Sequence, residues 1–224
     1  MSTSRDRVRQ ALSHQGSDRI PVDFGATAVT GIHCRVVEAL RKHYGLSYKP
    51  VKIVDTFQML GEVDRDLADA MGVDCIGVGG TRDIFDHDTE CMHEQVTPWG
   101  QKVLVPIQLD LTQDKEGDIF VYAGGDKNYP PSAVMPNGCF FINAIERQQP
   151  IDEDKLNPMD NLEEFNSITD EELDAYKKKV NEASATGRAV VASFGGTALG
   201  DVAFVPGMGL KEPKGIRSVV EWYM

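Results

Sequence analysis

Basic residues are scarce in this 224-residue chain. It has 23 lysines and arginines against 35 aspartates and glutamates, which gives a formal net charge of −12 at pH 7. Proteins that bind nucleic acids contact the phosphates through clustered lysine and arginine side chains. The charge balance therefore argues against a nucleic-acid partner. It also disfavours a strongly anionic substrate unless local arginines offset the field.

Long apolar runs are lacking as well. No segment approaches the roughly 20 consecutive apolar residues that a membrane-spanning helix needs. The first ten residues, MSTSRDRVRQ, are too polar for a secretory signal. We therefore expect a cytoplasmic protein with no membrane partner. Hydrophobic residues make up 41% of the chain and charged residues 26%, a composition typical of a globular protein.

The four cysteines form no C-x-x-C pair. They lie far apart, at Cys34, Cys75, Cys91 and Cys139, and this distribution fits reduced thiols better than a disulfide framework. Cys91 and His93 come nearest to a pair of metal ligands, but a single C-x-H in a loop is a weak metal signal. The sequence therefore predicts no metal site within the chain. We expect His87 and His93 to be solvated.

Short strands and helices alternate over the first 80 residues. Strands are predicted at 19–24, 51–54 and 74–78, with helices from Thr3 or Ser4, over 32–44, and over a stretch that turns Leu60, Val63, Leu67 and Met71 inward. Gly16, Gly45 and Gly72 stand where these helices should end. The alternation is typical of a parallel sheet with right-handed crossovers, in which the carboxyl ends of the strands meet at one edge.

Residues 81–146 break this alternation. The stretches EQVTPWGQKVLVPIQLDL, DIFVYAGG and CFFINAI read as short antiparallel strands with turns at 98–100, 116–117 and 136–138. We interpret this region as a β insertion after the third strand, and such insertions commonly cover or shape a site.

A helix and a strand are predicted again beyond the insertion. Thr169 and Glu172 form a possible capping box, Gly187 ends the helix, and a strand follows over 188–194. The last residues, PKGIRSVVEWYM, begin an amphipathic helix that has no cap. With four barrel-type strands where a closed (β/α)8 barrel has eight, we expect an α/β fold of the TIM-barrel type truncated to roughly its amino-terminal half. Residues 1–224 would then be part of one barrel domain.

Polar residues and glycines follow several of these strands, at the edge where barrel enzymes carry their chemistry. Asp55 comes directly after an apolar strand, where a partly buried carboxylate can bind a ligand or titrate. Alternatively, Asp55 or Thr56 caps the next helix. Gln58 lies one turn further on and either faces the same pocket or decorates the helix surface.

Two glycine-containing loops are further candidates. Asp23 and His33 bound the first, and they are either the rim of an active site or a loop cap and a residue of the first helical turn. The second, GGTALG, includes Gly195 and Gly196 and matches neither the P-loop pattern nor G-x-G-x-x-G. It either lets the backbone approach a large ligand closely or makes a tight turn.

Several segments together resemble the uroporphyrinogen decarboxylase superfamily. They are SRDRVRQALSHQGSDRIPVDFG, TGIH, VDTFQMLGEVDRDLADAMGVDCIGV, TPWG and EPKGIRSVVEWYM, and they span essentially the whole chain. The most specific pieces are DR-x-PVDFG and the D-x-x-Q that begins at Asp55. The closer match is the methyltransferase-like branch, which includes the methylcobalamin:coenzyme M methyltransferases. The resemblance implies a (β/α)8 barrel whose site lies in its mouth. Family members are longer, so this chain would be the amino-terminal part.

One departure separates the branches of this superfamily. The decarboxylases follow the first strand with an arginine-containing R-Q-A-G-R loop that binds substrate carboxylates. Here the loop is GATAVTGIH, with no arginine between Arg19 and Arg35. A porphyrinogen with its eight carboxylates would meet little positive charge there. Asp55 does match the strand-end aspartate that faces the pyrrole N–H groups in the decarboxylases.

The resemblance therefore implies a methyltransferase that passes a methyl group between a methylated corrinoid protein and a small acceptor such as a thiol. Asp55 would be the catalytic residue, Asp23, His33 and Gln58 would line the mouth, and Gly195 and Gly196 would admit the macrocycle. The branch binds zinc through a His-x-Cys pair and a distant cysteine, so we expect zinc in a missing carboxyl-terminal half and no turnover by this fragment alone. The alternatives are a uroporphyrinogen decarboxylase and a non-catalytic tetrapyrrole- or corrinoid-binding module.

Overall fold

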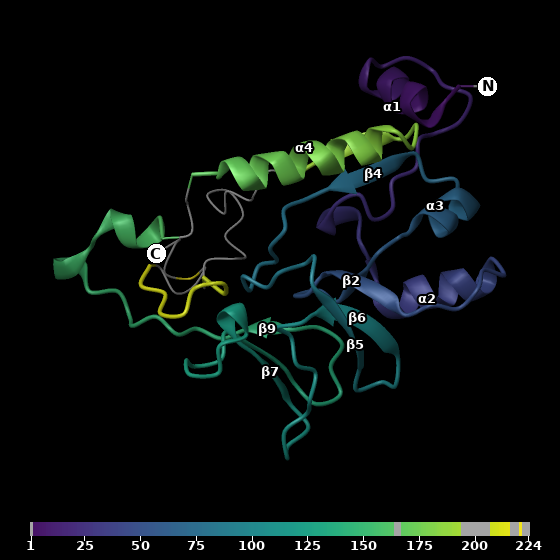
Figure 1. Ribbon diagram of the computed structural model, residues 1–224. Helices are drawn as coiled ribbons and strands as arrows, with labels where there is room; N and C mark the ends of the chain where they lie inside the picture. Colours follow the sequence, from purple (N-terminus) through teal and green to yellow (C-terminus); the bar gives the residue numbers. More distant parts are fainter. Residues whose placement is uncertain (1, 164–166, 194–206, 216–219, 221–224) are drawn as a thin grey trace. The chain divides into compact units, whose positions relative to one another are not determined.

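The computed structural model of the chain describes residues 2–163, 167–193, 207–215 and 220 (Figure 1). The chain divides into two compact units. The first spans Met1–Asp55, Leu60–Thr81 and Ile168–Gly195, and the second spans Thr56–Met59, Arg82–Ser167 and Gly196–Met224. Within the described residues the fold is mixed α/β, with several sheets and without a closed barrel.

Helix α1 (Ser4–Leu12) begins as predicted and ends early. A capping box between Thr3 and Asp6 starts it. The helix was expected to reach Gly16, but it stops at Leu12 because His14 takes the left-handed conformation, with φ 55°. The Gln15 N–H then donates to the Gln10 carbonyl at 2.8 Å, which closes a Schellman motif. Histidine performs here the task that glycine usually performs.

The prediction of a strand at 19–24 is wrong. Residue Pro21 has no N–H, and the Val22 N–H donates to the carboxylate of Asp74 at 2.9 Å, so no ladder forms. The segment nevertheless follows strand β4 (Cys75–Val78) in the same direction. The Val22 carbonyl accepts the Asp74 N–H at 2.7 Å, and further on a Cβ at Gly77 would lie 2.0 Å from the carbonyl oxygen of Ala26.

Strands β1 (Ile32–His33), β3 (Leu60–Gly61) and β2 (Val51–Asp55) form an antiparallel arrangement in that order. The strand predicted at 51–54 is confirmed. The helix expected from Leu60 is shorter, because Asp64 caps helix α3 (Arg65–Met71) through the Leu67 N–H and leaves Leu60 and Gly61 extended. Gly61 has no room for a side chain, since a Cβ there would lie 2.5 Å from Val51.

Helix α2 (Cys34–His43) occupies most of the predicted range 32–44. Gly45 and Gly72 follow α2 and α3 with φ of 67° and 66°, so both predicted left-handed glycines are confirmed.

Strands β4 and β10 (Ala189–Ala192) pair in parallel, and helix α4 (Asp170–Ser184) runs along β4 (Figure 1). The predicted capping box of Thr169 and Glu172 is present. Tyr176 and Ala183 of the helix pack with Val78 in one apolar cluster. This βαβ-type layer is the part of the predicted parallel sheet that the described residues confirm. In a barrel, the strand at 51–54 would lie between the predicted strands at 19–24 and 74–78 and run parallel to both. In the structure, it instead pairs antiparallel with β3.

The second unit confirms the antiparallel strands predicted within 81–146. Strands β5 (Met92–Val96) and β6 (Lys102–Pro106) form one antiparallel pair. Strands β7 (Ile119–Val121), β8 (Ala133–Met135) and β9 (Asn143–Ala144) form a second sheet. Short 3₁₀ turns complete the described structure at Ala28–Thr30, Ala123–Gly125, Glu153–Lys155 and Pro158–Asn161. In the described part of the chain, no helix is long and apolar enough to cross a membrane.

A buried carboxylate ties the start of the chain to β4. Asp74 is fully buried, and its oxygens lie 3.0 Å from Arg7 Nη1 and 2.6 Å from Arg19 Nη1. Burial raises the pKa of the Asp74 carboxyl, but hydrogen bonds from Val22, Ser4, Arg19 and Arg7 outweigh it and lower the pKa below its ordinary value. The carboxylate is therefore the charged centre around which α1 and residues 19–22 are arranged.

We expect Asp74→Asn to lower the free energy of unfolding by about 3 kcal/mol, because it removes one partner of a buried ion pair. Urea unfolding followed by far-UV circular dichroism measures the change. The matched control is Asp174→Asn, since Asp174 pairs with Lys177 at 2.8 Å but its side chain is 74% exposed. The control should change stability by less than about 0.5 kcal/mol. Equal small effects in both variants would contradict the central position given to Asp74.

Candidate functional site

Asp23 stabilises the loop of residues 23–31 through hydrogen bonds to its own carboxylate. Its carboxylate accepts the Ala26 N–H and the Thr30 hydroxyl, both at 3.2 Å, and the Gly25 N–H donates to the Thr30 carbonyl at 2.8 Å. Asp23 also lies close enough to Cys75 for its charge to contribute to the raised pKa of that thiol, behind the larger effect of burial. Asp23 therefore lies beside the start of β4, and its contacts are those of the loop cap considered as one alternative.

His33 and Asp55 come together through β3. Both residues stand opposite Leu60 in the strand register, His33 from β1 and Asp55 from β2. Two strand spacings put their Cα atoms about 10 Å apart. A β-bulge between Ile53 and Asp55 interrupts the register at this point. Bulges re-aim side chains and are frequent beside active sites.

The loop from Asp23 lies against the same leucine. A Cβ added to Gly31 would lie 2.3 Å from Leu60 Cδ1, so the backbone approaches Leu60 as closely as glycine allows. His33 then begins helix α2, where its Nδ1 accepts the Arg35 N–H at 3.3 Å. Within the first unit, the structure thus gathers the loop, His33 and Asp55 around Leu60.

The other candidate residues fall elsewhere. Gln58 belongs to the second unit, where it is half-buried in the turn of residues 56–59. Gly195 and Gly196 lie outside the described residues, as does the rest of GGTALG. The edge predicted for the parallel strands is present where β4 and β10 end, because the Ser193 N–H donates to the Val78 carbonyl at 2.8 Å. Neither Asp55 nor Thr56 caps α3, whose cap is Asp64.

A buried polar cluster in the second unit was missed by the sequence analysis. The Thr56 hydroxyl donates to Asp83 Oδ2 at 2.6 Å, and His87 Nδ1 lies 3.3 Å from the same oxygen. Asp83 Oδ1 accepts the Phe85 and His87 N–H groups, both at 2.9 Å. The expectation that His87 is solvated is wrong, because its side chain is fully buried.

The cluster is structural rather than catalytic, and His87 Nδ1, although 3.3 Å from Asp83 Oδ2, makes no hydrogen bond among the described residues. His87 Nε2 lies 2.9 Å from the Tyr122 carbonyl, which can only accept, so Nε2 carries a proton. Burial raises the pKa of the Asp83 carboxyl, but the contacts from His87 and Thr56 outweigh burial and lower the pKa. Thr56 donates to the carboxylate and not to the imidazole, so it is not activated as a nucleophile. The one sequence signal was Asp83 and His87 four residues apart around the apolar Phe85.

The cysteines differ in exposure. Cys34 is fully buried beside His33, and burial raises the pKa of its thiol to about 12. Cys91 and Cys139 are exposed, and the negative charge of Asp88 raises the pKa of Cys91. Within the described ranges, no group of three or more histidine, cysteine, aspartate or glutamate side chains is arranged to hold a metal ion.

Comparison with known proteins gives no relative for this chain. No family model matches it, no curated protein is similar to it at a significant level, and no solved structure resembles it significantly.

We expect Asp83→Asn to destabilise the second unit by about 2 kcal/mol, because the buried carboxylate accepts hydrogen bonds from the Thr56 hydroxyl and the Phe85 and His87 N–H groups, and an amide nitrogen cannot accept. The matched control, three residues along the chain, is Asp86→Asn, whose carboxylate is 58% exposed and whose φ of 61° suits asparagine. The control should stay within about 0.5 kcal/mol of the parent protein.

The same pair predicts an acid dependence. Because the folded-state pKa of Asp83 is lowered, its contribution to stability is complete above the unfolded pKa of about 3.9 and is lost as the pH falls through the lower folded value. Urea midpoints measured from neutral pH down to the acid limit should therefore fall more steeply for the parent than for Asp83→Asn. Parallel curves would contradict the assignment.

We expect iodoacetamide to modify Cys139 first, Cys91 more slowly and Cys34 only after unfolding, because alkylation requires an accessible thiolate. Timed quenching followed by peptide mass mapping measures the order. Rapid labelling of Cys34 in the folded protein would contradict the burial described for it.

Proposed function

We propose that this chain belongs to a methyltransferase of the uroporphyrinogen decarboxylase superfamily, with a (β/α)8-type barrel. It would pass a methyl group between a methylated corrinoid protein and a small acceptor such as a thiol. The observation that carries the proposal is the placement of Asp55 and His33 on either side of Leu60, at a bulge that ends β2. Asp55 is the residue that the resemblance makes catalytic.

The hydrogen-bonding chemistry of these two side chains suits a corrinoid. His33 Nδ1 accepts the Arg35 N–H, so the neutral ring carries its proton on Nε2 and acts as a donor there. Asp55 is an acceptor. The edge of a corrin ring carries carboxamides, which offer both N–H donors and carbonyl acceptors. A donor and an acceptor about 10 Å apart at the backbone can therefore contact two such groups.

The lack of an available arginine in the loop of Asp23 favours a methyltransferase over a decarboxylase. Arg19, the arginine that precedes the loop, donates to Asp74 at 2.6 and 2.9 Å and to the Gly72 carbonyl at 2.8 Å. Its charge is committed to the fold, and none of the residues from Ile20 to Cys34 is a lysine or an arginine. The carboxylates of a porphyrinogen would meet no free guanidinium in this loop.

The zinc that the resemblance implies has no ligand set among the described residues. We therefore assign no residue of this chain to zinc. Its chemical contribution, when bound, is to lower the pKa of a thiol so that a thiolate forms. The residues assigned here bind and orient the corrinoid. The loop of Asp23, which packs on Leu60 through Gly31, supports that position.

The test uses the native gene product, whose length is settled by reading its coding sequence past the codon for Met224 and weighing the intact protein. Methyl transfer from methylcobalamin to a thiol is followed by the change in cobalamin absorbance. We expect Asp55→Asn to lower the rate by about tenfold or more, the effect of losing one charge-assisted hydrogen bond. The matched control is Glu62→Gln, an exposed carboxylate just beyond β3 that should retain full activity.

Other outcomes decide between the alternatives. Saturable binding of methylcobalamin with no methyl transfer would replace the proposal with a non-catalytic corrinoid-binding module. Conversion of uroporphyrinogen to coproporphyrinogen would make the protein a decarboxylase. Absence of both binding and conversion would overturn the assignment to this superfamily.

A further inference from the structure

Arg147 holds a glycine-containing loop of the second unit. The residue follows β9, and its guanidinium donates to two main-chain carbonyls, Gly207 at 2.8 Å through Nη2 and Lys211 at 3.1 Å through Nη1. The loop between these carbonyls is turned by a hydrogen bond from the Leu210 N–H to the Gly207 carbonyl at 3.0 Å. Gly207 has φ 57°, a conformation that favours glycine.

This guanidinium has no countercharge in the described part of the chain. Its two hydrogen-bond partners there are uncharged main-chain carbonyls, and its Nε is buried with no acceptor among the described residues. Burial lowers the pKa of Arg147, and no opposite charge offsets the effect. The cations Lys211 and Lys214 each have a carboxylate partner, because Lys211 pairs with Asp126 at 2.7 Å and Lys214 lies 3.9 Å from Glu163.

Arg41 of the first unit shows what a structural arginine has instead. It is almost fully buried, and its Nε, like that of Arg147, has no acceptor among the described residues, but its guanidinium donates to the carboxylates of Asp64 and Asp66 at 2.7 to 2.9 Å. Proteins pair a cation that they take out of water, since an unpaired buried charge is strongly unfavourable. Arg147 is half-buried and departs from this rule.

We propose that Arg147 anchors an oxyanion-binding site in the second unit, which takes the carboxylate, sulfonate or phosphate of a ligand. A guanidinium has five N–H donors, and the two carbonyls use two of them. The contacts to Gly207 and Lys211 fix the plane of the group before a ligand arrives. An oxyanion at the remaining Nη hydrogens supplies the missing negative charge and completes a charge-assisted, two-point contact.

The site is distinct from the one proposed for the corrinoid, because it uses none of the residues around Leu60. It also does not depend on the proposed methyl transfer. Its ligand is defined by an anionic oxygen group, in a protein whose overall charge is −12 and which binds anions only where a local cation permits it.

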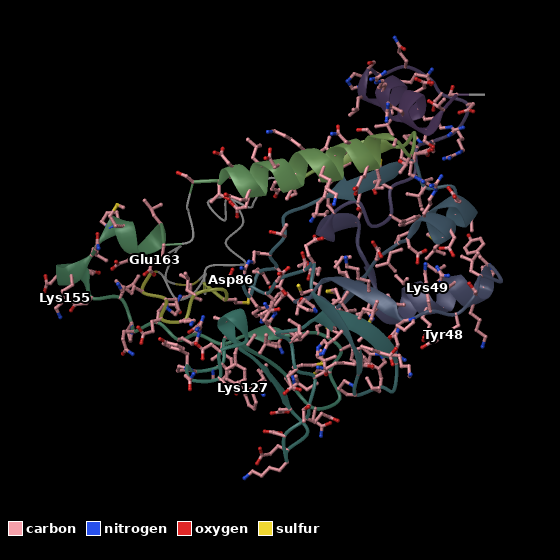
Figure 2. The ribbon with its side chains drawn as sticks, viewed as in Figure 1. Tyr48, Lys49, Asp86, Lys127, Lys155 and Glu163 are labelled. Carbon is pink, nitrogen blue, oxygen red and sulfur yellow. The ribbon has the colours of Figure 1, made fainter. Side chains whose placement is uncertain are left out.

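The experiment is calorimetric titration of the full chain, in a low-chloride buffer, with inorganic phosphate, methanesulfonate and acetate in separate runs. We expect saturable one-to-one binding of at least one of the three, and their order identifies the oxyanion class. Arg147→Gln should abolish that binding. The matched control, Lys127→Gln, removes a positive charge from an exposed position of the same unit (Figure 2) and should bind as the parent does.

A conservative variant keeps the proposal testable if Arg147→Gln does not fold. Arg147→Lys retains the charge but lacks the planar fork, so it should bind about tenfold more weakly than the parent. Its thermal midpoint should rise less with added anion than that of the parent. The proposal is overturned if none of the three anions binds saturably, or if Arg147→Lys binds with the affinity of the parent.

Discussion

The first unit depends on one carboxylate that has no access to water. Asp74 stands at the entrance to β4 and receives two arginines and a main-chain N–H. A buried aspartate must be surrounded by donors, or its desolvation would unfold the region. Satisfying it fixes where α1 lies, through Arg7, and where residues 19–22 run, through Arg19 and Val22. Because Arg19 donates to Asp74, its guanidinium is engaged in the fold and is not available to bind a ligand. The need to satisfy this one buried charge thus determines where α1 and residues 19–22 lie, and it engages the arginine that precedes the loop of Asp23.

Within the part of the chain that the structure describes, local patterns predicted the helices and most strands, whereas most of the helix predicted in PKGIRSVVEWYM lies outside it. The helix start at Thr3 or Ser4, the capping box at Thr169 and the left-handed glycines at Gly45 and Gly72 are local signals, and the structure confirms all four. The errors are tertiary in origin. Nothing in the neighbouring sequence says that the Val22 N–H will be taken by a carboxylate 52 residues away. The barrel, inferred from the alternation of strands and helices as well as from the resemblance, and the function, inferred from the resemblance, remain predictions.

The candidate site could be predicted only in part. The position of Asp55 at a strand end was readable from the apolar residues before it. The pairing of His33 and Asp55 with the same residue was not, because it depends on the hairpin of β2 and β3, in a stretch that has helical spacing. Burial of His87 was missed because a histidine between two aspartates looks hydrophilic. A hydropathy pattern scores a histidine or an aspartate as hydrophilic, so it cannot predict that such a side chain is buried beside a polar partner.

Gly77 links the strand layer to the loop of Asp23. It reads as an ordinary residue in an apolar strand, yet any Cβ there would overlap the carbonyl of Ala26. A substitution at this position cannot be absorbed by a rotamer change, since the obstacle is main chain. It would displace the loop and, with it, the contacts of Asp23 to Ala26 and Thr30. A substitution in β4 would therefore change the conformation of a loop in which no residue has been replaced.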